Sequence, residues 1–134
     1  MLDLNLPKLN TESETNGVWF KYNDSISFKI ARYGNVEYIR EMLKFREEYQ
    51  PLIDNKEVSE DEAKKILAEV YSRTILKDWK GIEEGDSGKL EYTIQNGVGL
   101  LSDERYRDVN EFIVYKAKES SHYYEQELNN TKKK

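Results

Sequence analysis

The segment "SEDEAKKILAEVYSRTI", residues 59–75, constrains the fold more than any other part of the sequence. Its apolar side chains recur at steps of three and four residues, which places them on one face of an α-helix. Ser59 and Glu62 stand at the spacing of a capping box, in which each side chain satisfies a backbone N–H near the other at a helix start. We therefore predict an amphipathic helix whose apolar face packs against another element.

A second amphipathic helix is predicted just before it. Asn35 can cap this helix by accepting a hydrogen bond from an early backbone N–H. Its apolar residues mostly follow three- and four-residue steps and comprise Val36, Ile39, Met42, Leu43 and Tyr49. Because proline lacks an N–H and clashes with the preceding turn, we expect the helix to end at Pro51.

The stretch "GVWFKYNDSISFKIAR", residues 17–32, has the features of a β-hairpin. Ile26, Phe28 and Ile30 alternate with polar or small neighbours, which is the period-two pattern of a half-buried strand. The polar residues "NDS" between the two apolar runs suit a short turn.

Two further helices are predicted near the C-terminus. Thr93 can cap a short helix that contains "GVG" at Gly97–Gly99, where we interpret the glycines as a point of close helix packing. Asp103 can cap a last helix. The apolar stripe of that helix comprises Tyr106, Val109, Phe112, Ile113 and Ala117.

These elements predict one mainly α domain, residues 17–127, of about four helices with an N-terminal β-hairpin. Residues 1–16 show neither helical nor strand periodicity, so we expect a mobile N-terminal arm. Residues 128–134 include the polar end "NNTKKK", and we expect a disordered C-terminal tail.

Charge and composition exclude several classes of protein. With 26 acidic and 21 basic residues the net charge is -5, which disfavours binding to nucleic acid. The chain has no cysteine, no apolar run long enough to span a membrane, and no signal-peptide pattern at its start. We expect a soluble intracellular protein that binds neither nucleic acid nor membrane.

We find no constellation of residues for catalysis, for a cofactor or for a metal. His122 is the only histidine and has no obvious catalytic partner. The acidic, glycine-spaced loop within residues 77–104 fails the register of a calcium loop: placing Gly85 sixth makes Lys80 the first ligand, and placing Gly88 sixth leaves Ile94 at the twelfth position. We expect a non-enzyme with no cofactor and no metal, and a solvated connector between two helices at this loop.

The order of elements resembles the tail assembly chaperones of long-tailed, non-contractile (siphovirus) bacteriophages. The likeness covers about residues 17–127 and departs from the family at the two glycines of "GVG", where helix formers are usual. It is carried by the hairpin, by "LLSD", by the last helix, and by the positions Ala31, Arg32, Gly34, Asn35, Trp79, Gly81, Asp86, Gly88, Tyr92, Thr93 and Asn96.

The resemblance implies a protein that binds the hydrophobic tape-measure protein in the host cell cytoplasm, keeps it soluble, and promotes polymerisation of the tail tube around it. Such chaperones are absent from the mature virion, and many have a frameshifted longer form that recruits the tail-tube protein. The alternative is a structural tail or head-tail connector protein that stays in the virion. The sequence leaves homo-oligomerisation open.

Exposed aromatic side chains are good anchors for a protein partner because they contribute contact area at a low cost in conformational entropy. The partner-binding candidates are Trp19, Phe20, Trp79, Tyr106 and Tyr115. The competing interpretation for each is an ordinary core residue.

Overall fold

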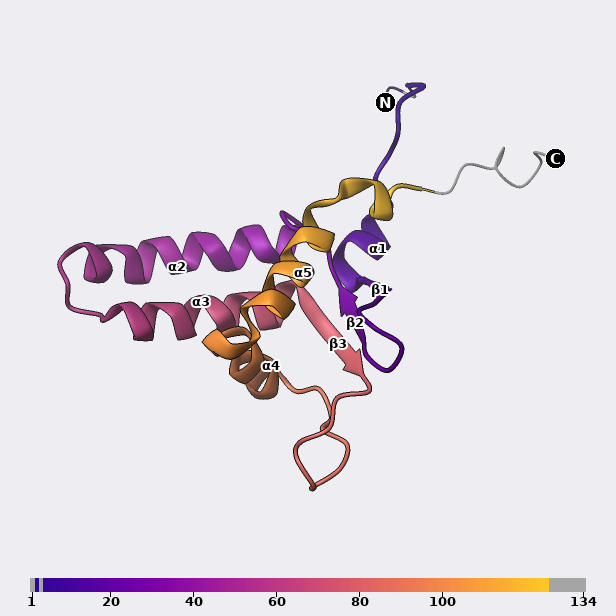
Figure 1. The fold of residues 1–134 in the computed structure, drawn as a ribbon. Coiled ribbons are helices and arrows are strands. Elements are labelled where there is room, and N and C mark those ends of the chain that lie inside the picture. The colour runs from indigo at the N-terminus through magenta and orange to yellow at the C-terminus, as the bar shows by residue number, and fades with distance from the viewer. Residues whose placement is uncertain (1, 3, 126–134) are drawn as a thin grey trace.

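The computed structural model describes residues 2 and 4–125, so the tail expected at 128–134 lies outside the described residues. The mainly α fold with an N-terminal hairpin is confirmed (Figure 1). The helices are α1 (Thr11–Asn16), α2 (Val36–Asp54), α3 (Glu60–Thr74), α4 (Ile94–Leu101) and α5 (Arg107–Lys118), with short 3-10 helices η1 (Glu104–Tyr106) and η2 (Ser120–Tyr123). The strands are β1 (Val18–Lys21), β2 (Ser27–Ile30) and β3 (Leu76–Lys80).

Helices α2 and α3 form an antiparallel arm that projects from the sheet and the other helices (Figure 1). Both predicted caps are present: the Asn35 side chain accepts a hydrogen bond from the Tyr38 N–H at 3.0 Å, and Ser59 and Glu62 form the capping box. The expected end at Pro51 is wrong, because α2 continues to Asp54. The proline lies near the end of α2, where its missing N–H removes only the bond to the carbonyl of Glu47, an exposed residue that water can reach, and the Pro51 carbonyl still accepts from the Asn55 N–H.

The three strands form one antiparallel sheet in the order β1-β2-β3. Strand β3 corrects the prediction that the chain after α3 is only a connector. A bulge in the β2-β3 ladder pairs Ile30 with Leu76 and Phe28 with Trp79, so two residues three apart both face the core. The bulge hides the period-two pattern by which a strand is recognised in a sequence.

Residues 11–16 are not the mobile arm expected from the sequence, because they form helix α1. The side chain of Asn10 caps α1 by accepting from the N–H groups of Glu12 and Ser13, and the Asn10 N–H donates to the carbonyl of Tyr123 at 2.7 Å. Glu14 forms an ion pair with Arg32 at 3.0 Å. A helix of six residues is too short to show a helical period in the sequence. Because so short a helix is not stable alone, these contacts with distant parts of the chain stabilise it.

The hydrophobic core lies between the inner face of the sheet and the helices. Its members with no exposed surface include Ile30, Ala31, Ile75, Leu76, Ile113, Ala117 and Tyr123. The Tyr123 hydroxyl donates to the carbonyl of Ile30 at 2.9 Å, which ties η2 to β2 across most of the chain's length. Helix α5 packs against β2 and covers this face of the sheet.

Candidate functional site

The five aromatic candidates divide into buried and exposed residues. Phe20 and Trp79 are 9% and 6% exposed and belong to the core, which corrects their assignment as surface anchors. Both side chains face inward because each pairs across the sheet with Phe28, the central inward residue of β2. Tyr106 and Tyr115 are 41% and 62% exposed.

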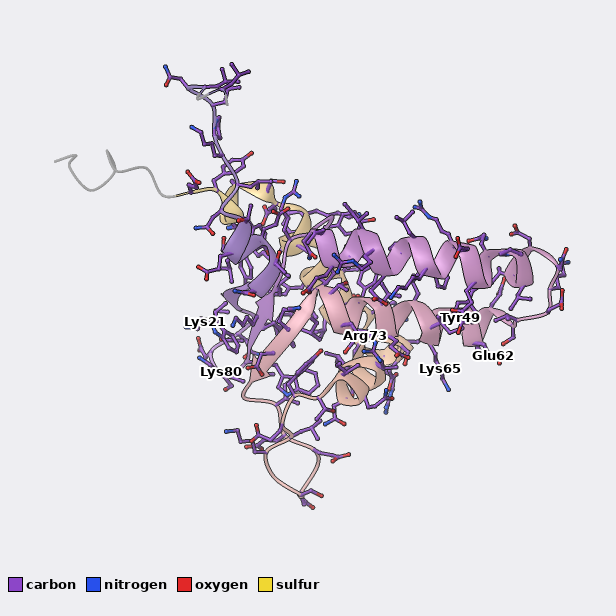
Figure 2. The ribbon with its side chains drawn as sticks, turned by 180° about the vertical axis from the view of Figure 1, so that it is seen from behind. Lys21, Tyr49, Glu62, Lys65, Arg73 and Lys80 are labelled. Carbon is purple, nitrogen blue, oxygen red and sulfur yellow. The ribbon has the colours of Figure 1, made fainter. Side chains whose placement is uncertain are left out.

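Trp19 is the fifth candidate and lies on the outer face of the sheet, 37% exposed. The ammonium group of Lys80 lies 4.1 Å from the centre of its ring, a cation–π contact. Figure 2 shows Lys80 and Lys21 at the same end of the sheet. Trp19 is therefore partly covered by a lysine of its own chain. It lies on β1, whereas Tyr106 is the last residue of η1 and Tyr115 lies within α5.

A groove of about 580 Å³ is bounded by the hairpin, β3, the loop 82–90, α4, η1 and the start of α5. We call it the Trp79 groove. Its apolar lining comprises Phe28, Trp79, Ile82, Leu90, Leu100 and Val109. Tyr22 and Tyr106 add aromatic walls, so the groove brings together two of the five candidates, Trp79 and Tyr106.

Polar contacts from the loop hold the wall of this groove in place. The indole N–H of Trp79 donates to the carbonyl of Leu90 at 2.8 Å, and the ring of Tyr92 meets the indole edge to face with centroids 5.1 Å apart. The Tyr92 hydroxyl lies 2.6 Å from the carbonyl oxygen of Leu76. Burial raises the pKa of this hydroxyl, so it stays protonated and able to donate. The predicted connector is thus tethered at Trp79 and again at Tyr92.

The chain enters the loop at a position that only glycine suits. Gly81 has φ +85°, and a Cβ there would overlap the backbone carbonyl of Ser25 in the hairpin turn. The hairpin turn and the end of β3 therefore approach each other more closely than side chains allow. This contact brings Tyr22 and Ile26 to the same groove as the loop.

The two glycines of α4 have different surroundings. A Cβ on Gly97 would overlap the hydroxyl of Ser72 on α3, so the predicted close packing is confirmed at this position. A Cβ on Gly99 would meet nothing within 4 Å, although Gly99 lines the Trp79 groove. The packing interpretation is therefore wrong for Gly99, whose missing side chain leaves the groove open.

The rim of the groove is acidic. Glu83 and Glu84 line it and Asp86 follows in the same loop, and within the described residues none of the three forms an ion pair. Arg105 lies on the opposite wall, but its guanidinium binds Asp103 at 2.8 Å. Hydrogen bonds from Arg105 lower the pKa of Asp103 to about 2, so Asp103 offsets this positive charge at neutral pH.

A second exposed surface lies on α2 and was missed by the sequence analysis. Val36, Ile39 and Leu43 are 58%, 50% and 59% exposed, at the i, i+3, i+7 spacing that places them on one side of the helix. We call them the α2 stripe. Their spacing predicted that they belong to the packed face of α2, but the buried residues of that helix are Tyr38 and Phe45. The sequence does contain a sign of this exposed surface, because the apolar residues of α2 occupy two sides of the helix.

We also looked for a metal site, a catalytic histidine and a membrane-spanning helix in the described part of the chain. No group of three or more His, Asp or Glu side chains is placed to hold a metal ion among residues 2 and 4–125. His122 hydrogen-bonds Glu119 at 2.8 Å and meets the Phe20 ring edge to face, both of which suit a packing role. Within the same described residues, no helix combines the length and apolarity needed to cross a membrane.

Comparison with known proteins assigns the chain to a family. Residues 33–134, which include α2 through η2, match the family described as YdaY prophage protein. Comparison with curated proteins and with solved structures finds no match. The matched segment is well over half of the 134 residues, and the chain therefore belongs to the YdaY prophage protein family and is of bacteriophage origin.

Proposed function

We propose that this prophage protein is a tail assembly chaperone that binds the tape-measure protein, keeps it soluble, and promotes polymerisation of the tail tube around it. The observation that carries the proposal is the α2 stripe, an exposed apolar surface on an otherwise highly charged chain. Contiguous exposed apolar residues on a soluble protein mark sites of interaction. Membership of a prophage family and the resemblance of the element order to these chaperones support the same role.

The size of the α2 stripe suits a reversible contact. Fully burying an aliphatic side chain contributes roughly 1.5–3 kcal/mol, and the three stripe residues are already about half buried, so covering them contributes about 2–4 kcal/mol. Many copies bound along a long apolar helix would protect it together, while each copy could still be displaced by a tube subunit. The exposed charges of Arg40, Lys44 and Glu47 on the same helix help to keep the free chaperone soluble.

The proposed role is non-catalytic and belongs to the host cell cytoplasm before the particle is complete. The tape-measure protein is the proposed client. The tail-tube protein is a second partner, recruited through a frameshifted longer form of the chain. Self-association of the chaperone along the client is compatible with the multivalent contact described above.

The test is co-expression of this chain with the tape-measure protein of the same prophage, followed by measurement of the soluble fraction and co-purification. We expect the parent chain to keep the tape-measure protein soluble. The double variant Ile39→Glu/Leu43→Glu should lose most of this effect, because it places charge on the contact surface while glutamate keeps a good helix propensity.

The matched control is Lys65→Glu, at an exposed position on α3 whose side chain points away from α2 in Figure 2. The control should behave like the parent chain. Failure of the parent chain to solubilise or bind the tape-measure protein would refute the proposal. Stoichiometric presence of the chain in purified virions, measured by mass spectrometry, would favour the structural tail or connector protein instead.

A further inference from the structure

We propose that the Trp79 groove is a docking site for an amphipathic helix of a partner protein, with apolar anchors and basic flanking residues. This site lies on the sheet, the 82–90 loop and α4, and shares no residue with the α2 stripe. The groove is therefore a separate surface, and its occupant does not depend on whether the α2 stripe binds the tape-measure protein.

The volume and lining of the groove suit side-chain anchors of a protein. A volume of about 580 Å³ falls within the range of roughly 300–1,000 Å³ that is typical of binding pockets. Among the described residues, no buried side-chain nitrogen or oxygen lacks a hydrogen-bond partner, so no unsatisfied buried group is available to orient a small polar ligand. The apolar lining instead favours leucine-sized or aromatic anchors.

The backbone around the groove favours a helix over an added strand. A strand would need free backbone groups along the outer edge of β3. Backbone groups of β3 are already partly engaged by side chains: the carbonyl of Leu76 accepts from the Tyr92 hydroxyl, and the Trp79 N–H donates to the Asp78 carboxylate at 2.8 Å. A helix needs no backbone partner, because it inserts side chains spaced three and four residues apart.

The charges on the rim select the kind of helix. Glu83 and Glu84 line the groove without an ion pair inside the described chain, and Asp86 extends the same acidic loop. The charge of Arg105 across the groove is already offset by Asp103. A helix with lysine or arginine beside its anchors meets complementary charge here, whereas an acidic helix meets repulsion.

The test uses two fluorescently labelled helical peptides with identical leucine anchors, one with lysine and one with glutamate at the flanking positions. Binding to the full chain is measured by fluorescence anisotropy at low and at physiological salt. We expect the lysine peptide to bind roughly tenfold more tightly at low salt, with the preference shrinking as salt rises, since rim charge pairs are weak individually and screened.

Two variants tie this binding to the groove. Gly99→Leu places a side chain in the open space of the groove and should weaken binding of the lysine peptide by at least about tenfold. Glu83→Lys/Glu84→Lys should remove or reverse the preference between the peptides. The control Glu47→Lys/Glu48→Lys makes the same charge change at exposed positions on α2 and should leave the preference intact apart from a small uniform shift.

Circular dichroism and the unfolding midpoint show whether each variant is folded. Equal affinity for the two peptides, no binding of the lysine peptide, or unchanged binding by folded Gly99→Leu would each overturn the proposal. A fall in the oligomeric mass of Gly99→Leu, measured by light scattering, would overturn it as well, because it would show that a second copy of this chain occupies the groove.

Discussion

Replacing each glycine of α4 by alanine should change stability in opposite directions. The two positions are two residues apart in one helix, so alanine gains a similar helix propensity at both, up to about 1 kcal/mol. The surroundings differ: a methyl group at Gly99 enters open space, whereas a methyl group at Gly97 overlaps the hydroxyl of Ser72. The sign of each change therefore depends on packing and not on propensity.

The magnitude at Gly97 follows from what Ser72 does. Ser72 is 2% exposed, and its hydroxyl donates to the carbonyl of Ile94 at 2.8 Å and lies 2.9 Å from the Tyr92 hydroxyl. Overpacking costs about 1–3 kcal/mol, and displacing this hydrogen bond costs about 1 kcal/mol more. After the propensity gain, Gly97→Ala should lose about 1–3 kcal/mol, whereas Gly99→Ala should gain about 0.5–1 kcal/mol.

The assay is urea unfolding followed by far-UV circular dichroism, with thermal melts as a second measurement. A chain of this length should shift by about 3–5 °C per kcal/mol. The midpoint of Gly97→Ala should fall and that of Gly99→Ala should rise, at unchanged m-value. If Gly97→Ala is as stable as the parent, the close contact between α3 and α4 does not control stability and the packing argument fails.

Three further predictions concern single polar groups. Asn35→Ala should lose about 2–4 kcal/mol in urea unfolding, because Asn35 is fully buried, caps α2 and donates two side-chain hydrogen bonds; Asn35→Asp, which keeps only the cap, should not restore full stability. Tyr92→Phe should lose about 1–2 kcal/mol by leaving the carbonyl of Leu76 without this donor, and a loss within error of zero would contradict that role. Asp103 should titrate in NMR with a pKa of about 2 against an ordinary 3.8, since Arg105 stabilises its charged form. Its stabilising contribution is thus present above about pH 4 and lost as the pH falls through 2, a dependence that Asp103→Asn should remove.

Local patterns predicted the helices α2, α3, α4 and α5, and they predicted the caps of the first three correctly. Asn35, the Ser59–Glu62 box and Thr93 each cap a helix through the side-chain hydrogen bond that the sequence suggests. Asp103 is also a helix cap, but it caps η1, which precedes α5, and does not cap α5 itself. These predictions succeed because a cap and an amphipathic face involve residues only a few positions apart.

The errors arose where distant segments decide the structure. Strand β3 forms because Phe28 and Ile30 of the hairpin pair with Trp79 and Leu76, some fifty residues later. Helix α1 forms because it contacts Arg32 and η2. Neither partner is visible from the local sequence.

The candidate sites also depend partly on local sequence and partly on contacts between distant segments. The sequence by itself determined a mainly α domain with a hairpin, a charged surface, and a set of aromatic side chains that includes Trp79 and Tyr106. Only the tertiary structure decided which of those aromatic residues are core, that Gly99 leaves a groove open, and that Val36, Ile39 and Leu43 face solvent. The physical reason is that periodicity identifies an apolar face of a helix, but whether another element covers that face depends on contacts distant in the chain.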